Sequence, residues 1–211
     1  MLITSVNHQA WGDTLVAVLG PDPDQQTVRV AQDIVGIYDE QGSAVGFNFF
    51  HASQWVGELE GEGQVFLDAA QVAKLNAALA AADLPGTLEV DGSHLVIGKI
   101  VGFEPHPDSD HLHITQVDLG DGHTEQIVCG APNAALGQTV VAATPGTMMP
   151  DGKLIWPGEL RGVASYGMLC AARELAIPNA PQQRGILIMP DDIAAGTAYD
   201  PTVAAAVVAA Q

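Results

Sequence analysis

Hydrophobic and polar positions follow a strand pattern over much of the first fifty residues. Residues 14–20 (TLVAVLG) form a short apolar run of strand length. Residues 28–50 (VRVAQDIVGIYDEQGSAVGFNFF) predict a long strand, a turn and a returning strand, and the DEQG turn places Gly42 where hairpin loops commonly need a positive φ. The apolar residues of the return strand alternate, which predicts one buried face: Val45, Phe47 and Phe49.

The clearest helical pattern lies in residues 67–86 (LDAAQVAKLNAALAAADLPG). Asp68 can cap the start of this helix, and Gln71 follows three residues later, as in a capping box. The helix is expected to end at Pro85–Gly86. One side of it is apolar: Val72, Leu75 and Leu79. We therefore predict a small α+β domain over residues 1–90, whose role the sequence does not name.

From residue 95 onward, short apolar runs are separated by Gly, Pro and Asp. Strands are expected in LVIGKIVGFE, HLHITQVDLG, EQIVCG, TVVAAT and GILIMP, a density typical of a small barrel or sandwich. The apolar residues change face between Ile114 and Val117, which a β-bulge in a curved strand would explain. A short helix is expected around CAARELAI (170–177), and the tail PTVAAAVVAAQ is expected to pack on the body as a helix or strand.

Composition narrows the class of protein. Of 211 residues, 47% are hydrophobic and 15% charged, which indicates a folded chain long enough for two small domains. Seven basic residues face twenty-five acidic ones, and the net charge of −18 repels nucleic acids and anionic membranes at long range. The first residues do not resemble a signal peptide, and no run approaches the roughly 18 apolar residues of a membrane span. We expect a cytoplasmic protein that does not contact membranes.

One stretch looks like a reactive site. Residues 106–113 (HPDSDHLH) hold three histidines and two aspartates, which could bind a metal or act in acid–base catalysis. The simpler interpretation is a turn in which Asp108, Ser109 and Asp110 cap backbone N–H groups. Cysteines 129 and 170 form no CxxC pair, and GxSxG, HExxH and P-loop signatures are absent from the sequence. We therefore predict no catalytic residue, metal site, cofactor or small-molecule substrate.

The motifs of the second half occur in an order that carries a family likeness. IGKIVGFEPHPDSDHLHITQVDLGDG is followed by QIVCGAPNAALGQTVVAATPGTMMPDG, LRGVASYGMLCAARELAI and GILIMP. Together they resemble, over roughly residues 95–205, the oligonucleotide-binding-fold (OB-fold) tRNA-binding domain at the amino terminus of the bacterial phenylalanyl-tRNA synthetase β subunit. The preceding ninety residues resemble the α+β domain of YtpR-type tRNA-binding-domain proteins. The catalytic machinery of the synthetase has no counterpart here.

The resemblance implies an all-β OB-fold over residues 91–211, a five-stranded barrel with a short helix, that binds tRNA without catalysis. It also implies that Arg161, Ser165 and Met168 meet the RNA. Residue chemistry adds further candidates. Lys153 could contact phosphates, and Asn133 could supply hydrogen bonds. Tyr166 or Trp156 could stack on bases, and His111 could add positive charge at low pH.

Charge predicts that tRNA binding is weak and salt-dependent, because phosphate neutralisation dominates such binding. From residue 95 onward, five basic residues face twelve acidic ones. The family's Asp–Lys–Leu turn reads Asp110–His111–Leu112 here, and its lysine-rich segment reads IWPGE (155–159). The alternative is a protein-interaction module that docks another protein or forms a homodimer through an apolar patch. That patch would consist of Trp156, Met148 and Met149.

Overall fold

The computed structural model of the protein describes residues 1–210. The chain forms two compact units that divide between Gly92 and Ser93. Strands dominate both units, and helices are few and short. Within residues 1–210, no helix combines the length and the hydrophobicity needed to cross a bilayer.

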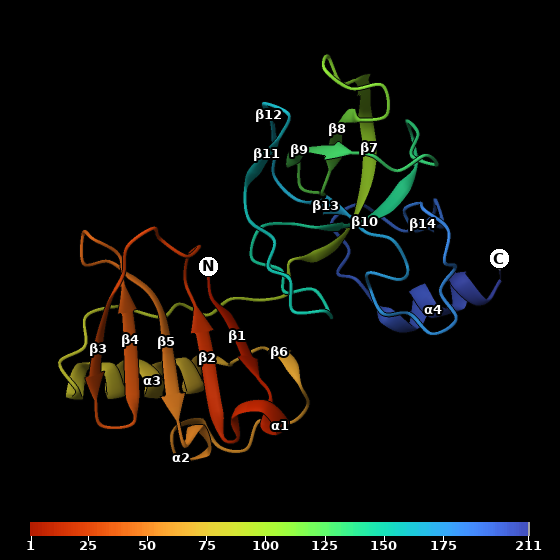
Figure 1. Cartoon of the computed structure of the whole chain (residues 1–211). Coiled ribbons are helices and arrows are strands. Elements are labelled where there is room, and N and C mark those ends of the chain that lie inside the picture. The colour runs from red at the N-terminus through yellow and green to blue at the C-terminus, as the bar shows by residue number, and fades with distance from the viewer. Residues whose placement is uncertain (211) are drawn as a thin grey trace. The chain divides into compact units, whose positions relative to one another are not determined.

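The first unit is a six-stranded antiparallel sheet in the order β3-β4-β5-β2-β1-β6, with helix α3 along one face (Figure 1). Its strands are β1 (Ile3–Val6), β2 (Thr14–Val18), β3 (Thr27–Ala31), β4 (Ile34–Tyr38), β5 (Ala44–Phe50) and β6 (Gly63–Val65). Its helices are α1 (His8–Trp11), α2 (Ala52–Val56) and α3 (Ala69–Ala81). The helix and the sheet enclose one apolar core.

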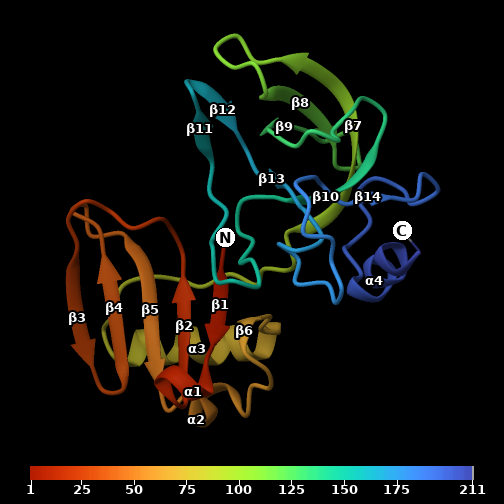
Figure 2. The ribbon, with the colours of Figure 1, turned by 45° about the vertical axis from the view of Figure 1, so that its right-hand side comes forward.

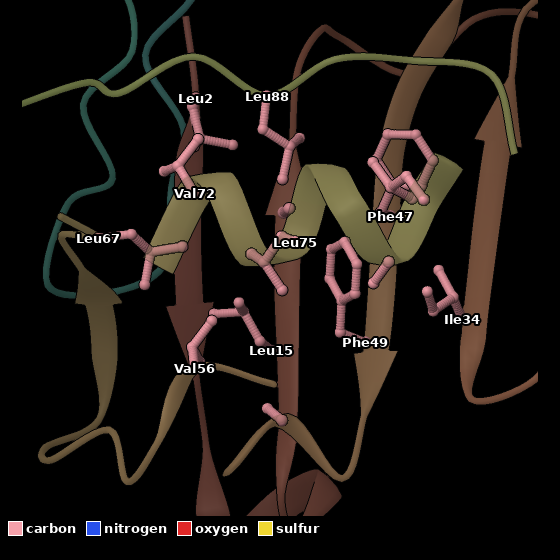
Figure 3. Close-up of a cluster of buried hydrophobic side chains, with 14 of the residues drawn as sticks. Leu2, Leu15, Ile34, Phe47, Phe49, Val56, Leu67, Val72, Leu75 and Leu88 are labelled. Atoms are coloured by element: carbon pink, nitrogen blue, oxygen red, sulfur yellow. The ribbon is translucent and has the colours of Figure 1, made fainter. Parts of the chain in front are cut away.

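The core of the first unit is built as the sequence pattern predicts. Asp68 accepts a hydrogen bond from the Gln71 N–H, and the Gln71 side chain accepts one from the Asp68 N–H, so the capping box is confirmed. The apolar face of α3 packs against the return strand β5, as Figure 3 shows. Of the six residues predicted for the buried faces, Val45 is only half-buried, and the other five are almost fully buried: Phe47, Phe49, Val72, Leu75 and Leu79.

The long strand predicted for residues 28–38 is in fact a hairpin. Strands β3 and β4 are joined by the two residues Gln32 and Asp33, and Gln32 has a φ of 53°. Asn–Gly or Asp–Gly in a sequence indicates a hairpin turn. A turn that places a different, non-glycine residue in the left-handed region gives no such indication. The next turn contains Gly42 at a φ of 81°, so the positive φ predicted there is confirmed.

The second unit contains an antiparallel sheet in the order β13-β10-β7-β8-β9, and β14 also pairs with β10. The strands are β7 (Leu95–Pro105), β8 (His113–Asp118), β9 (Thr124–Cys129), β10 (Thr139–Ala143), β13 (Met168–Leu169) and β14 (Ile188–Met189). Strands β11 (Gly158–Leu160) and β12 (Val163–Ser165) form a separate hairpin, seen as a paired ribbon in Figure 2. Helix α4 (Pro201–Ala209) is formed by the apolar tail.

Strand β10 is buried on both faces, which explains its continuous apolar sequence TVVAA. Val140 and Ala142 belong to one apolar cluster, together with residues of β8 and β9. Val141 and Ala143 belong to a second cluster, which α4 completes with Ala204. The terminal helix therefore covers the outer side of the sheet, and the first cluster lies inside the curve of the strands.

The predicted five-stranded barrel differs from the observed sheet, whose strand pairings leave it open between β13 and β9. Strand β13 has only two residues, and the segment before it meets β9 through isolated bonds. The Tyr166 N–H donates to the Gln126 carbonyl at 2.8 Å, and the Gln126 Nε2 donates to the Ala164 carbonyl at 2.8 Å. A ladder is absent here because the chain turns at Gly167, which has a φ of 143°.

Two local predictions in the second unit are wrong in detail. The bulge lies on β7, where the pairing to β8 shifts between Ile100 and Gly102, and not on β8. On β8 the buried residues are Thr115 and Val117, and the Thr115 hydroxyl donates to the Ile127 carbonyl at 2.6 Å, so an apolar residue is not required at that position. The helix expected at residues 170–177 is a series of turns, which ends at Ala176 with a φ of 52°.

Candidate nucleic-acid interface

The LRG motif forms the tip of a hairpin. Leu160 of β11 pairs with Val163 of β12, so Arg161 and Gly162 are the two residues of the turn. Their φ values are 47° and 78°, and two consecutive positive φ values mark a type I′ hairpin turn. Glycine suits the second position because it adopts positive φ without strain. The turn thus places the Arg161 side chain at an exposed tip.

This tip is bonded to the loop that connects β7 and β8. The Arg161 Nη1 donates to the Asp108 carbonyl at 2.8 Å, and the His106 Nε2 donates to the Leu160 carbonyl at 3.0 Å. His106 is 3% exposed, and its Nδ1 accepts the Asp108 N–H at 3.1 Å. With one ring nitrogen donating and the other accepting, the hydrogen bonds fix the orientation of the His106 ring. The HPDSDHLH and LRG motifs therefore form one site, although more than fifty residues separate them.

The loop at residues 106–112 is a turn, as predicted, but its capping groups differ from the prediction. The Ser109 hydroxyl accepts the Leu112 N–H at 3.2 Å and, at a longer distance, the His111 N–H. A second capping group is His106, and the Asp110 carboxyl bonds to the His111 ring and to its own N–H. Within residues 1–210, no three His, Cys, Asp or Glu side chains are grouped to hold a metal ion.

His111 is exposed beside the tip and is hydrogen-bonded to Asp110. The His111 Nδ1 lies 2.9 Å from the Asp110 Oδ1. This hydrogen bond is the main cause that lowers the pKa of the Asp110 carboxyl, and the charge of Arg161 adds to it. A carboxylate therefore lies near the tip, and its negative charge opposes the approach of a phosphate to Arg161.

The structure uses the polar groups of Ser165 and Asn133 internally. Ser165 is 3% exposed, and its hydroxyl accepts the Val128 N–H at 3.1 Å and donates to the Gly167 carbonyl at 3.3 Å. The Asn133 amide donates to the Ile186 carbonyl at 2.9 Å and accepts the Ile186 N–H at 2.8 Å. Both side chains hold loops together, so their role as direct RNA contacts stays a prediction that this geometry does not favour.

A groove of about 280 Å³ lies beside the hairpin, where Leu160, next to the turn, lines it. Leu112 and Leu160 line one part of it, and Met168 of β13 also lines it. Arg173 and Arg184 line it as well. Met168 is half-buried, so the structure places this predicted contact in the wall of a depression. An adjoining hollow of about 520 Å³ shares Arg184 and the neighbouring Gly185 and includes Asn133.

The other predicted contacts lie outside this groove. Lys153 and Tyr166 are exposed, and Tyr166 has 41% of its surface accessible. Trp156 is half-buried, which leaves part of its ring available for stacking. Met149 is only 3% exposed and belongs to the core, so the apolar patch proposed with Trp156 and Met148 loses this member.

Neither cysteine has the environment of a nucleophile. Both thiols are free and buried. Burial raises the pKa of Cys129, and it raises the pKa of Cys170 to about 12, so both stay protonated near neutral pH. Because the thiolate is the reactive form, these residues act as small apolar groups.

Arg173, Arg184 and His106 were not selected from the sequence as site residues. The two arginines are isolated along the chain, in LCAARELA and PQQRGI, and only the fold brings them to one groove. The second unit has only five basic residues, so each of them is a candidate for contact with a phosphate. That scarcity is the one sequence signal that points to the two arginines. His106 was considered as a ligand, but its buried bond to Leu160 depends on a contact 54 residues away.

Comparison with known proteins extends this picture. Residues 95–198 match a family described as "Putative tRNA binding domain", and residues 21–91 match a "Domain of unknown function (DUF4479)". The β subunit of phenylalanine–tRNA ligase from Bacteroides thetaiotaomicron is 51% identical over 106 residues, which is 49% of this chain but 13% of that subunit. A solved MetRS-related protein from Pyrococcus horikoshii matches with a TM-score of 0.37 and 18% identity over 49% of this chain and 85% of that one, too low to support an argument.

A further relative spans both units. The "Putative tRNA-binding protein YtpR" of Bacillus subtilis (strain 168) is 39% identical over 196 residues, which cover 92% of this chain and 96% of that protein. The resemblance noted from the motifs of the two halves is thereby confirmed. The chain belongs to the YtpR family of tRNA-binding proteins.

Proposed function

We propose that this protein binds tRNA without catalysis, through residues 91–211, and that the Arg161 hairpin tip makes the central contact. The observation that carries the proposal is the bonding of this tip to the 106–112 loop, because it fixes an exposed guanidinium on two motifs of a tRNA-binding family. Arginine is suited to phosphate because its planar group donates two parallel hydrogen bonds. A tRNA ligand also leads us to expect the protein in the cytoplasm.

The proposal includes an OB-fold barrel in which residues 164–167 complete the closure against β9. Three hydrogen bonds support this closure, and Ser165 supplies one of them through Val128. Barrels of this type bind RNA by shape, backbone contact and stacking. Ser165 would then act by holding the barrel edge in place, while Met168, Lys153, Tyr166 and Trp156 remain candidates for contact.

The test is fluorescence anisotropy of labelled bulk tRNA against the purified full chain, from about 50 to 300 mM salt. We expect saturable binding that weakens as salt rises. Arg161→Glu should lower the affinity about tenfold or more, and Arg161→Lys should keep most of it, since a phosphate contact depends first on charge. Lys74→Glu makes the same change in net charge at an exposed position of α3 and serves as the matched control.

Equal weakening by Arg161→Glu and Lys74→Glu would mean that only net charge matters, and the tip would lose its assigned role. Absence of binding by the wild-type protein at tens of micromolar would overturn the tRNA-binding proposal. Duplex DNA is the ligand control, because a narrow preference for tRNA should leave it bound more weakly.

A further inference from the structure

Two arginines line the groove, and each is anchored to a backbone carbonyl, one in the groove wall and one in the adjoining hollow. The Arg173 Nη1 donates to the Gln183 carbonyl at 2.7 Å, and the Arg184 Nη2 donates to the Gly130 carbonyl at 3.3 Å. A guanidinium carries five N–H donors. One donor of each arginine is engaged within residues 1–210, so the remaining donors are available on side chains whose position is already fixed. Such pre-organisation lowers the entropic cost of binding an anion.

Glycines set the shape of the groove wall. A Cβ at Gly130 would come within 2.9 Å of the Leu112 Cδ2, and a Cβ at Gly185 would come within 2.8 Å of the Asn133 Oδ1. Gly185 also has a φ of 155°, in the region that favours glycine. Gly185 is therefore favoured by its backbone conformation as well as by the close packing, whereas a larger residue at Gly130 would require Leu112 to move.

The size of the groove indicates what can enter it. The two adjoining hollows, of about 280 and 520 Å³, are on the scale of single small-molecule sites and not of a double helix. Their walls also include apolar side chains such as Met168, Ile186 and Leu187. A cationic groove can follow the phosphates of a single strand, and these aliphatic side chains offer apolar contact to the base faces, although no aromatic side chain among residues 1–210 lines either hollow.

One charge opposes this use of the groove. Glu174 also lines it, and its Oε2 accepts the Ala171 N–H at 2.7 Å, which holds the carboxylate in place. The charge of Glu174 contributes to the raised pKa of Cys129 and of Cys170, so its field reaches the floor of the groove. The two arginines therefore outweigh the carboxylate by one unit of charge.

We propose that Arg173 and Arg184 form a phosphodiester-binding site for an unpaired segment of RNA, in which Glu174 keeps the affinity low. This inference rests on the proposed tRNA-binding function and adds a second contact, which the Arg161 tip does not provide. A duplex would meet the tip, while an unpaired strand would enter the groove. The scarcity of basic residues is then offset in part by placing two of the five in one channel.

The experiment measures binding of three labelled probes to the full chain: bulk tRNA, a single-stranded oligoribonucleotide of about ten residues and a blunt duplex of the same sequence. Arg173→Gln/Arg184→Gln should weaken the single strand roughly 25-fold at 0.1 M salt, about fivefold for each contact, and reduce the salt slope by about 1.4. The duplex should change little. Glu174→Gln keeps an acceptor for the Ala171 N–H and should tighten single-strand binding several-fold.

Two controls separate charge from folding. Lys74→Gln/Lys99→Gln removes the same two charges from positions that line neither hollow, and it should leave the single-strand affinity within about twofold. Arg173→Lys/Arg184→Lys keeps the charges and should retain most of the binding. Thermal melts identify any variant that fails to fold, and Glu174→Gln, whose expected effect is a gain, cannot be mimicked by misfolding.

The outcomes distinguish the two proposals. If wild-type protein binds tRNA, and Arg173→Gln/Arg184→Gln binds the single strand with the same affinity as Lys74→Gln/Lys99→Gln, the groove inference is wrong and the tRNA-binding function stands. If the duplex and the single strand weaken equally, the groove has no preference for unpaired RNA and the inference is also wrong. If wild-type protein binds none of the probes, both proposals fail together. If inorganic phosphate displaced the labelled single strand at the same concentration as unlabelled oligonucleotide does, the groove would be a general anion site without a preference for RNA. That result would contradict the inference.

Discussion

The two units differ in how far local sequence patterns specify their elements. In the first unit, a capping box starts α3, alternation buries Phe47 and Phe49, and one apolar cluster joins the helix to the sheet. Both units also contain side chains bonded to distant backbone groups, such as Thr4 to Val65 across 61 residues in the first. In the second unit, such bonds lie at the candidate site itself, where His106 reaches Leu160 across 54 residues and Ser165 reaches Val128 across 37.

Charge separates the two units as well. The first has two basic and thirteen acidic residues, and the second has five basic and twelve acidic ones, so the net charges are −11 and −7. The difference is concentrated at particular places in the second unit, at the Arg161 tip and in the Arg173–Arg184 groove. The comparison teaches that a binding surface on an acidic protein is defined by where a few cations are held, since the total charge is unfavourable in both units.

The largest expected effect tests whether packing dominates the first unit. Leu75 is fully buried on α3, between helix and sheet. Leu75→Ala should destabilise this unit by about 2–5 kcal/mol, because it removes apolar contacts and leaves a cavity. Urea unfolding measures the change, and Phe66→Ala, at a residue 52% exposed, should stay within about 0.5 kcal/mol. Similar losses for the two variants would contradict the packed core.

The same difference explains how far each unit could be predicted from sequence. The α3 helix and its cap could be predicted because Asp68 and Gln71 lie three residues apart and interact locally. The hairpin turn at Gln32–Asp33 could not, because a non-glycine residue at positive φ depends on the pairing of the strands it joins.

The site of the second unit was only partly predictable, for the same reason. Its motifs identified Arg161 and Met168, but the bond of Arg161 to the 106–112 loop and the grouping of Met168 with Arg173 and Arg184 depend on loops that meet only in the fold. The buried bond of Ser165 to Val128 is equally invisible in sequence, because nothing near either residue specifies the other. The sequence therefore identifies single residues of the site, but it does not show which of them lie together in the fold.

The second prediction compares one polar contact in each unit. Ser165→Ala leaves the buried Val128 N–H without an acceptor, which should cost about 1–3 kcal/mol. Asp68→Ala removes an exposed helix cap, which should cost about 1 kcal/mol. Amide hydrogen exchange locates the effects: Val128 should lose protection in the first variant and Gln71 in the second. Retained protection of Val128 in Ser165→Ala would show that the barrel edge closes without this hydroxyl.

The smallest effects concern two exposed carboxyl groups, one in each unit. The Ser53 hydroxyl donates to the Asp13 Oδ2 at 2.7 Å, and this hydrogen bond is the main cause that lowers the pKa of Asp13 below 3.8. His111 lowers the pKa of Asp110 in the same way. A lowered carboxyl pKa contributes stability above the unfolded value, and that stability is lost as pH falls through the folded value. Both contributions should therefore be present at neutral pH and vanish below about pH 4.

Carboxyl titration followed by NMR checks this directly. Ser53→Ala should return the pKa of Asp13 toward its ordinary value and leave Asp110 unchanged, and His111→Ala should do the reverse. For Asp13, the associated loss of stability should be only roughly 0.3 kcal/mol, because water screens an exposed group. If His111→Ala left the pKa of Asp110 low, the hydrogen bond from its own backbone N–H, which is the second cause of the shift, would be the main one instead. The imidazole would then not be the group that holds this carboxylate beside the tip.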